Sequence, residues 1–296
     1  MILVTQGHEK SISLEVFIKS YLCLSLAKQK QVKLYCYLDS LSHTLDSLNM
    51  AYQIHDNKLI ISSSFLELKL IDKSGSESLN CIEAAIDDIG DLDILLTLPT
   101  SKDQFNGQSG HTEYFRKRYN LRDIPMSFLS KNMNASLLTD HIAIKDISKN
   151  ITKDSIVNKV SILLKKYPQY KELKRVIFSG INPHNGESGQ MGSEENEIYA
   201  AIKILKKNFP NFEYLGPLPA DTLIFNGYDN RDLIIFSSHD QGLGIFKQQS
   251  GLLGINITFG LPFLRISPDH GTAFNLYLKN KANYQGCLYL LEEFTK

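Results

Sequence analysis

The sequence predicts an α/β fold with a largely parallel sheet. Short β-branched or aliphatic runs bounded by turn residues recur along the chain, and longer amphipathic stretches lie between them. Continuous apolar runs are typical of strands buried on both faces, and apolar residues at helical spacing are typical of helices with one buried side. Strands that alternate with helices in this way form parallel sheets.

The expected elements follow one another along the whole chain. The runs that predict strands are Ile2–Thr5, Val32–Tyr37, Asp93–Leu98, Ser136–His141, Val176–Ser179 and Leu233–Ser237. The stretches that predict helices are Ser11–Ala27, Cys81–Ile89, Ser155–Lys166, Glu194–Lys207 and Leu288–Glu293. No GxGxxG follows any of these strands, so a dinucleotide would need a different pyrophosphate site from the usual one.

Composition narrows the class of protein. The chain has 296 residues, 43% of them hydrophobic, which suits one or two globular domains. Lys+Arg and Asp+Glu both number 32, so the formal net charge is zero and we expect neither nucleic acid nor membrane as a partner. The 4 cysteines form no CxxC pair, and Met1–Val4 turns polar too soon for a signal peptide. We therefore expect a cytoplasmic protein.

Three histidines stand at or shortly after the ends of predicted strands. They are His141, His184 and His239. Since ligands of open α/β sheets bind at the carboxyl ends of the strands, these imidazoles could converge on one divalent metal ion. The alternative is that each ring is satisfied by backbone carbonyls at its own strand end.

A glycine-punctuated loop, Asn182–Gly192, surrounds His184 and leads into a predicted helix. Ser193 is the expected N-cap of that helix, and Glu194 and Glu195 complement its positive end. The glycines would let the backbone approach a ligand closely. A tight surface loop without function would have the same pattern.

Two further segments carry polar groups suited to binding anions. His111 and Thr112 stand at the apparent start of a helix that runs to about Tyr119, where free N–H groups attract a carboxylate or phosphate. Lys247 and Arg265 fall in stretches of low charge, and Asn256 lies between isoleucines. A phosphorylated substrate would give these groups a partner. The alternatives are a simple helix cap and exposed charges on a loop.

Together these motifs resemble the 4-hydroxythreonine-4-phosphate dehydrogenase family of pyridoxal phosphate biosynthesis. The resemblance covers nearly the whole chain and keeps the family's order of motifs. It is carried by Leu98–Lys102, Gly110–Glu113, Asp140-His141, Asn182–Glu195, Gly216–Thr222, His239–Gly242, Asn256–Arg265 and Asp269–Thr272.

The resemblance implies a role for particular residues. It implies metal binding by His141, His184 and His239, and substrate binding by His111, Thr112, Lys247, Asn256 and Arg265. Asp221 falls in a family motif close to the site, so the expected catalytic set is His141, His184, His239, Asp221 and Lys247.

The resemblance also implies the architecture. We expect a three-layer α/β/α fold similar to the isocitrate and isopropylmalate dehydrogenases, with the active site in a cleft at a homodimer interface. The chain would form one dehydrogenase unit of two intertwined subdomains. Residues 1–130 with the C-terminal part would form one of them, and residues 131–270 the other.

The implied reaction is the NAD- or NADP-dependent oxidation of 4-phosphohydroxy-L-threonine to 2-amino-3-oxo-4-phosphooxybutanoate, assisted by a divalent metal (Zn, Mg or Co). Decarboxylation to 3-amino-2-oxopropyl phosphate follows. The alternatives are a related dehydrogenase acting on a four-carbon aldonate phosphate, or a non-catalytic binding homologue. A zinc hydrolase has no support, because the chain lacks HExxH.

Two segments depart from the family pattern. Gly7–Glu15 stands where the family usually has a Gly-Asp-Pro-Ala-Gly-Ile-Gly-Pro-Glu segment, and Gln190 stands where the loop commonly holds a second histidine. These departures bear on substrate range and on cofactor handling.

Overall fold

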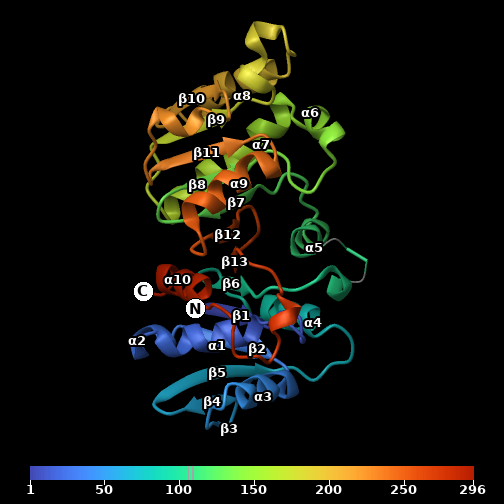
Figure 1. The fold of residues 1–296 in the computed structure, drawn as a ribbon, viewed down its shortest axis with the longest axis vertical. Coiled ribbons are helices and arrows are strands. Elements are labelled where there is room, and N and C mark those ends of the chain that lie inside the picture. The colour runs from blue at the N-terminus through green and yellow to red at the C-terminus, as the bar shows by residue number, and fades with distance from the viewer. Residues whose placement is uncertain (106, 109) are drawn as a thin grey trace. The chain divides into compact units, whose positions relative to one another are not determined.

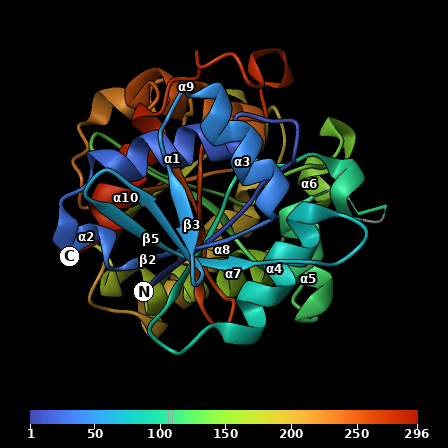
Figure 2. The ribbon, with the colours of Figure 1, turned by 90° about the horizontal axis from the view of Figure 1, so that it is seen from below.

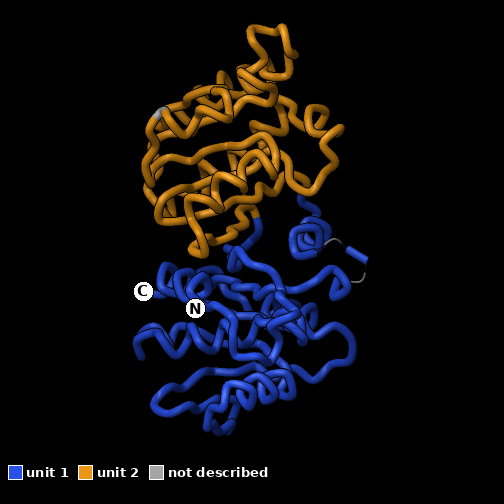
Figure 3. The backbone as a smooth tube through the Cα atoms, in the orientation of Figure 1, with its two compact units in different colours: residues 1–121, 261–296 blue, residues 122–260 orange. Residues whose placement is uncertain are grey.

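A computed structural model describes residues 1–105, 107–108 and 110–296. The chain divides into two compact units, which Figure 3 distinguishes by colour. Unit 1 consists of residues 1–121 and 261–296, and unit 2 of residues 122–260. The sequence-based split lay near residues 130 and 270, so both observed boundaries come earlier in the chain. Each unit contains its own set of strands and helices (Figure 1).

The sheet of unit 1 is parallel over most of its width. Its strand order is β13 (Leu264–Pro268), β6 (Ile94–Thr97), β1 (Ile2–Thr5), β2 (Val32–Cys36), β5 (Ser64–Leu70), β4 (Lys58–Ile61), β3 (Gln53–His55). Strands β13 to β5 are parallel, and β4 and β3 continue the sheet antiparallel. Strand β2 lies on one side of β1 and β6 on the other, so right-handed crossovers place α1 and α4 on opposite faces. Figure 2 shows these two helices on either side of the strands.

Most helices of unit 1 pack on this sheet. They are α1 (Ser13–Cys23), α2 (Leu26–Gln29), α3 (Leu38–Ser47), α4 (Glu77–Asp88), α5 (His111–Arg118) and α10 (Gln285–Phe294), with short 3-10 turns η1 (Lys102–Phe105) and η6 (Phe274–Leu276). The predicted helix Ser11–Ala27 is in fact two helices. Ser25 is extended and its hydroxyl accepts the amide of Lys28, so it caps a new short helix.

The sheet of unit 2 has a parallel part and an antiparallel edge. Its order is β10 (Glu213–Leu218), β9 (Arg175–Ser179), β11 (Asp232–Phe236), β8 (Asn134–Leu137), β7 (Met126–Leu129), β12 (Ile255–Thr258). The strands from β10 to β8 are parallel, and β7 and β12 run antiparallel to their neighbours. The predicted largely parallel α/β sheet is thus confirmed in both units.

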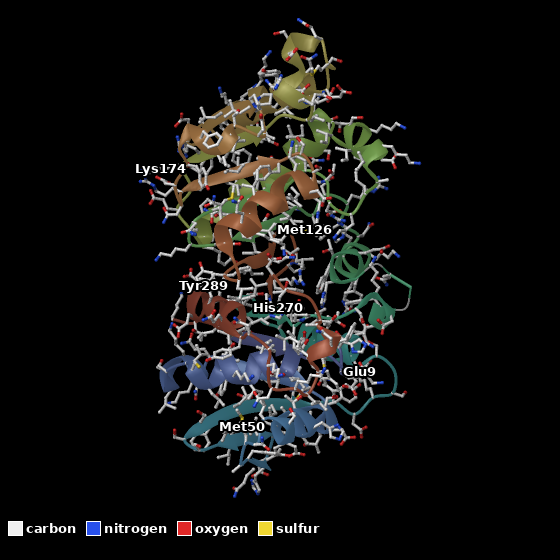
Figure 4. All side chains as sticks on the ribbon, viewed as in Figure 1. Glu9, Met50, Met126, Lys174, His270 and Tyr289 are labelled. Atoms are coloured by element: carbon white, nitrogen blue, oxygen red, sulfur yellow. The ribbon has the colours of Figure 1, made fainter. Side chains whose placement is uncertain are left out.

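The helices of unit 2 cover both faces of its sheet. They are α6 (Ile147–Asn150), α7 (Lys153–Lys166), α8 (Glu195–Asn208) and α9 (His239–Ser250), with 3-10 turns η2 (Ile144–Asp146), η3 (Tyr167–Gln169), η4 (Pro183–Gly189) and η5 (Leu223–Asn226). Leu243 and Phe246 of α9 pack in one core cluster with strand residues such as Ile234 and Met126. Figure 4 labels Met126. The intervening residues Leu233 and Ile235 are also buried, so the opposite face is covered as well.

One prediction about a helix end is wrong. Ser193 does not cap α8, because the helix begins at Glu195 after Glu194, and no side chain caps it. The carboxylate of Glu195 instead accepts the backbone amides of Ile181 and Asn182 at 3.0 and 2.7 Å. This buried glutamate therefore anchors the first residues of the loop that precedes the helix.

Among the described residues, no helix has both the length and the apolar character that a bilayer crossing requires.

Candidate functional site

The three predicted metal-binding histidines follow three neighbouring strands of unit 2. Strands β9, β11 and β8 lie side by side and run parallel, so their carboxyl ends share one edge of the sheet. His184 follows β9, His239 begins α9 after β11, and His141 follows β8. The local pattern of residues predicts a strand end before each histidine, and the order of strands in the sheet makes these ends adjacent.

His141 and His239 lie close together. Their ring centroids are 5.6 Å apart, with an interplanar angle of 43°. Nδ1 of His239 lies 2.7 Å from a carboxylate oxygen of Asp240. The second ring nitrogen, Nε2, is thereby left to face another ligand, and a carboxylate on Nδ1 is the usual support of a metal-binding imidazole.

His184 lies in a strained loop. His184, Asn185, Glu187 and Ser188 all have positive φ angles, from 43° to 59°, and Gly186 has 75°. Such a left-handed run is costly for residues with a Cβ and is concentrated at functional sites. Nδ1 of His184 lies 2.7 Å from Glu187. The hydrogen bond and charge of Glu187, followed by the charge of Asp221, raise the pKa of His184.

The imidazoles of His141, His184 and His239 are chemically suited to bind a divalent cation. Exposed imidazoles are suitable ligands for Zn or Co, and two of them already have a carboxylate on Nδ1. In the described part of the chain, no three His, Cys, Asp or Glu side chains lie close enough to hold one ion. The structure thus brings together His141 and His239, while the role of all three histidines stays a prediction.

The other predicted site residues of unit 2 lie on different elements. Asp221 is exposed after β10, and its charge acts on His184. Lys247 is exposed on α9, two turns beyond His239. Asn256 lies in β12 opposite Phe128, and its side-chain oxygen is buried without a hydrogen-bond partner among the described residues. A buried amide oxygen of this kind suits a polar ligand.

His111 and Arg265 act on each other electrostatically within unit 1. Arg265 is 3% exposed in β13, and burial lowers its pKa to about 10. Burial and, second, the charge of Arg265 hold the pKa of His111 well below its usual value, so the ring is neutral near pH 7. Its Nε2 is buried and has no hydrogen-bond partner in the described residues. A guanidinium beside a neutral imidazole suits an anion with a polar substituent.

Thr112 follows His111 in the first turn of α5, as predicted. The N-cap is Gly110, with a φ of 121°, and no side chain caps the helix. The first amides of α5 therefore have no side-chain acceptor from the cap, which leaves the helix start able to receive an anion.

Three residues that the sequence did not single out contact the predicted site. Thr97, at the end of β6, accepts Nε and Nη2 of Arg265 at 2.9 and 2.7 Å. Gln241 and Thr139 form hydrogen bonds that link the strand ends that precede the histidines. The available signal was a polar residue at the end of an apolar run, but many strands have such residues, so the pattern alone does not identify them.

The unusual N-terminal segment folds tightly after β1. A Cβ on Gly7 would lie 2.0 Å from the carbonyl oxygen of Pro99, so this position requires glycine. His8 lies edge-on to Phe274 with ring centroids 4.9 Å apart, and its Nε2 is 3.4 Å from Asp103. The loop therefore contacts the segments that follow β6 and β13.

Comparison with known proteins identifies the relatives of this chain. A family model described as pyridoxal phosphate biosynthetic protein PdxA matches residues 22–289. A 4-hydroxythreonine-4-phosphate dehydrogenase of Sulfurihydrogenibium sp. is 33% identical over 229 residues, which are 74% of this chain and 70% of the relative. The enzyme of that name from Aquifex aeolicus is 34% identical over 246 residues, 78% of this chain and 75% of the relative.

Solved structures agree on the fold. The crystal structure of 4-hydroxythreonine-4-phosphate dehydrogenase from Klebsiella pneumoniae has a TM-score of 0.80 and 23% identity, over 99% of this chain and 98% of that one. By fold, by family match and by sequence identity, the chain belongs to the PdxA family of pyridoxal phosphate biosynthesis, an oxidoreductase family of 4-hydroxythreonine-4-phosphate dehydrogenases.

Proposed function

We propose that the chain oxidises 4-phosphohydroxy-L-threonine with NAD or NADP and a divalent metal. The product, 2-amino-3-oxo-4-phosphooxybutanoate, then loses CO2 to give 3-amino-2-oxopropyl phosphate. The observation that carries the proposal is the order of β9, β11 and β8, which gives each of three adjacent parallel strands a histidine at its carboxyl end.

The residues that would hold the metal are His141, His184 and His239. A bound divalent cation supplies Lewis acidity, which lowers the pKa of a substrate hydroxyl. Glu187 and Asp240 would orient two of the imidazoles through their Nδ1 atoms.

The phosphate and carboxylate of the substrate would be held by positive and neutral donors. We assign these roles to Arg265, Lys247, Asn256, His111 and Thr112. Because Arg265 is buried, its interaction with a phosphate would be weakly screened by solvent. Neutral His111 can donate a hydrogen bond without adding a charge.

A nicotinamide dinucleotide would fit the carboxyl ends of β1 and β6. The order of strands reverses there, and ligands of open α/β sheets bind at such a point. The hydroxyl of Thr100 is buried there without a hydrogen-bond partner among the described residues, and a carboxylate oxygen of Glu9, 3.4 Å from Nδ1 of His8, is also buried. These polar atoms suit the hydroxyl and amide groups of a dinucleotide.

We further propose that the active site is completed in a homodimer. Light scattering on the purified protein would then give twice the mass of one chain. A monomer that turns over the substrate at full rate would contradict this part of the proposal.

The central test follows NADH formation with 4-phosphohydroxy-L-threonine, with and without a chelator. His184→Ala should lose bound metal and turnover together. His55→Ala is the matched control, because His55 also pairs with a carboxylate, that of Asp56, but is exposed in unit 1. Full activity of the His184 variant without metal would refute the mechanism. A higher kcat/KM for a four-carbon aldonate phosphate would instead show that this compound is the substrate.

A further inference from the structure

One buried network joins the three strand ends that precede the histidines, and its centre is Ser237. Backbone N–H of Ser237 donates to Oε1 of Gln241 at 2.9 Å and to Oγ of Ser179 at 3.1 Å. Its backbone oxygen accepts Oγ1 of Thr139 at 2.7 Å and the backbone amide of Thr139 at 3.2 Å. Ser237, which directly follows β11, thus contacts the ends of both neighbouring strands, β9 and β8.

Gln241 closes this network. Its Oε1 accepts Oγ of Ser179 at 2.8 Å as well as the amide of Ser237, and its Nε2 donates to the carbonyl of Gly180 at 2.9 Å. One side chain therefore uses both ends of its amide to connect α9 with the ends of β9 and β11. The hydroxyls of Ser179 and Ser237 lie on residues that are 0% and 2% exposed.

Each histidine lies a few residues beyond a member of this network. His141 is two residues after Thr139, and His239 is two after Ser237 and two before Gln241. His184 is four residues after Gly180, and Gly180 also packs closely against the loop that contains His184. A Cβ on Gly180 would lie 3.0 Å from the side-chain oxygen of Asn185, the neighbour of His184.

We propose that Gln241 is a positioning residue for the metal-binding histidines. With Ser179, Ser237 and Thr139 it fixes the spacing of the three strand ends, and so the starting points from which the imidazoles reach the ion. This inference rests on the proposed function. The physical reason is that a ligand set works only when its supporting groups hold the ligands in place, and outer groups of this kind typically change metal affinity about 10–100-fold.

The network at the opposite end of the same strands provides a matched control. The side-chain amide of Asn134, a residue 1% exposed at the start of β8, donates to the carbonyls of Asn230 and Asp232 at 2.9 and 3.1 Å. Asn134 thus joins β8 to β11 at their amino ends, away from the histidines. Its loss should lower stability by the same physical cause as the loss of Gln241.

The test measures Zn²⁺ affinity by chelator competition, together with the thermal unfolding temperature. Gln241→Met keeps the size of the side chain without its hydrogen bonds, and we expect it to weaken Zn²⁺ binding at least about tenfold. Asn134→Leu should lower the unfolding temperature similarly and leave the Zn²⁺ affinity within about twofold of the parent protein. With Co²⁺, the visible spectrum of the Gln241 variant should differ from that of the parent, because the ligand geometry changes.

Smaller changes guard against a variant that does not fold. Thr139→Val removes one tie and should weaken Zn²⁺ binding in the same direction, whereas Thr139→Ser keeps the hydroxyl and should restore it. Parent-like Zn²⁺ affinity in both the Gln241 and the Thr139→Val variants would overturn the positioning role. If His239→Ala bound Zn²⁺ as the parent does, the proposed metal site itself would be refuted.

Discussion

At the scale of single residues, the buried guanidinium of Arg265 depends on Thr97. The threonine hydroxyl accepts two of its N–H groups, and both residues are nearly inaccessible to solvent. Because Nε and Nη2 share one acceptor, this contact constrains the plane of the guanidinium. A substrate anion would therefore meet an arginine whose direction is already restricted.

Replacing Thr97 by valine should disturb that direction while keeping the shape of the side chain. We expect the KM for the phosphorylated substrate to rise about tenfold, which is about 1.4 kcal/mol. Thr97→Ser keeps the hydroxyl and should stay close to the parent protein. Steady-state kinetics on the three proteins decide this, and an unchanged KM in the valine variant would exclude the role of Thr97.

The buried ring of His111 gives the protein a pH-dependent stability. Unfolded His111 takes up a proton as the pH falls through about 6.5, whereas folded His111, with its lowered pKa, does not. The unfolded state then binds more protons than the folded state. The free energy of unfolding therefore decreases as the pH falls below about 6.5, by at most about 1.36 kcal/mol per pH unit.

His111→Gln should therefore show a shallower loss of stability between pH 7.5 and 5.5 than the parent protein, as followed by urea unfolding. His55→Gln serves as the control, because His55 is exposed. Identical pH profiles for the parent and the His111 variant would show that burial of this ring does not contribute.

At the scale of elements, helix α9 shows why a local pattern can fail. Helix α9 is not among the stretches named above as predicted helices, and it contains Gly242 and Gly244, although glycine is unfavourable inside helices. The structure explains one of the two glycines. A Cβ on Gly242 would lie 2.7–2.9 Å from carbon atoms of Phe236, whereas a Cβ on Gly244 would meet nothing within 4 Å.

The two glycines should therefore respond in opposite ways to alanine. Gly242→Ala should lower the free energy of unfolding by about 1–3 kcal/mol, because α9 must move away from β11. Gly244→Ala should raise it by about 1 kcal/mol through helix propensity alone. Chemical denaturation measures both, and a stabilised Gly242 variant would show that α9 does not need this close approach.

At the scale of the whole molecule, the chain builds two cores. Leu290 and Leu291 of α10 are 0% exposed and belong to unit 1, although they come from the end of the chain. Ile234 and Phe236 of β11, also 0% exposed, belong to unit 2. Unit 2 is continuous in sequence, and unit 1 is formed by both ends of the chain.

Two cores predict two separable unfolding transitions. Leu290→Ala and Ile234→Ala should each cost about 2–5 kcal/mol, because each leaves a cavity in a packed interior. In calorimetry, each substitution should lower a different transition. A single transition that both variants shift equally would show instead that the two units unfold as one.

The sequence by itself determined the class of fold, the positions of the main strands and the candidate site residues. Apolar runs such as Ile2–Thr5 and Asp93–Leu98 needed no tertiary information, because a strand buried on both faces has an apolar residue at nearly every position. The ends of elements differ from those expected. The predicted strand Ser136–His141 is β8, which ends at Leu137, four residues before the histidine.

Only the tertiary structure decided which strand ends become neighbours. Strand β11 lies between β8 and β9 although it follows both in sequence, and this places His239 beside His141. The tertiary structure also places Thr97 against Arg265, which is 168 residues away along the chain. Contacts at such separations depend on sheet order, which no local pattern of residues encodes, because a strand's own sequence fixes its faces but not its neighbours.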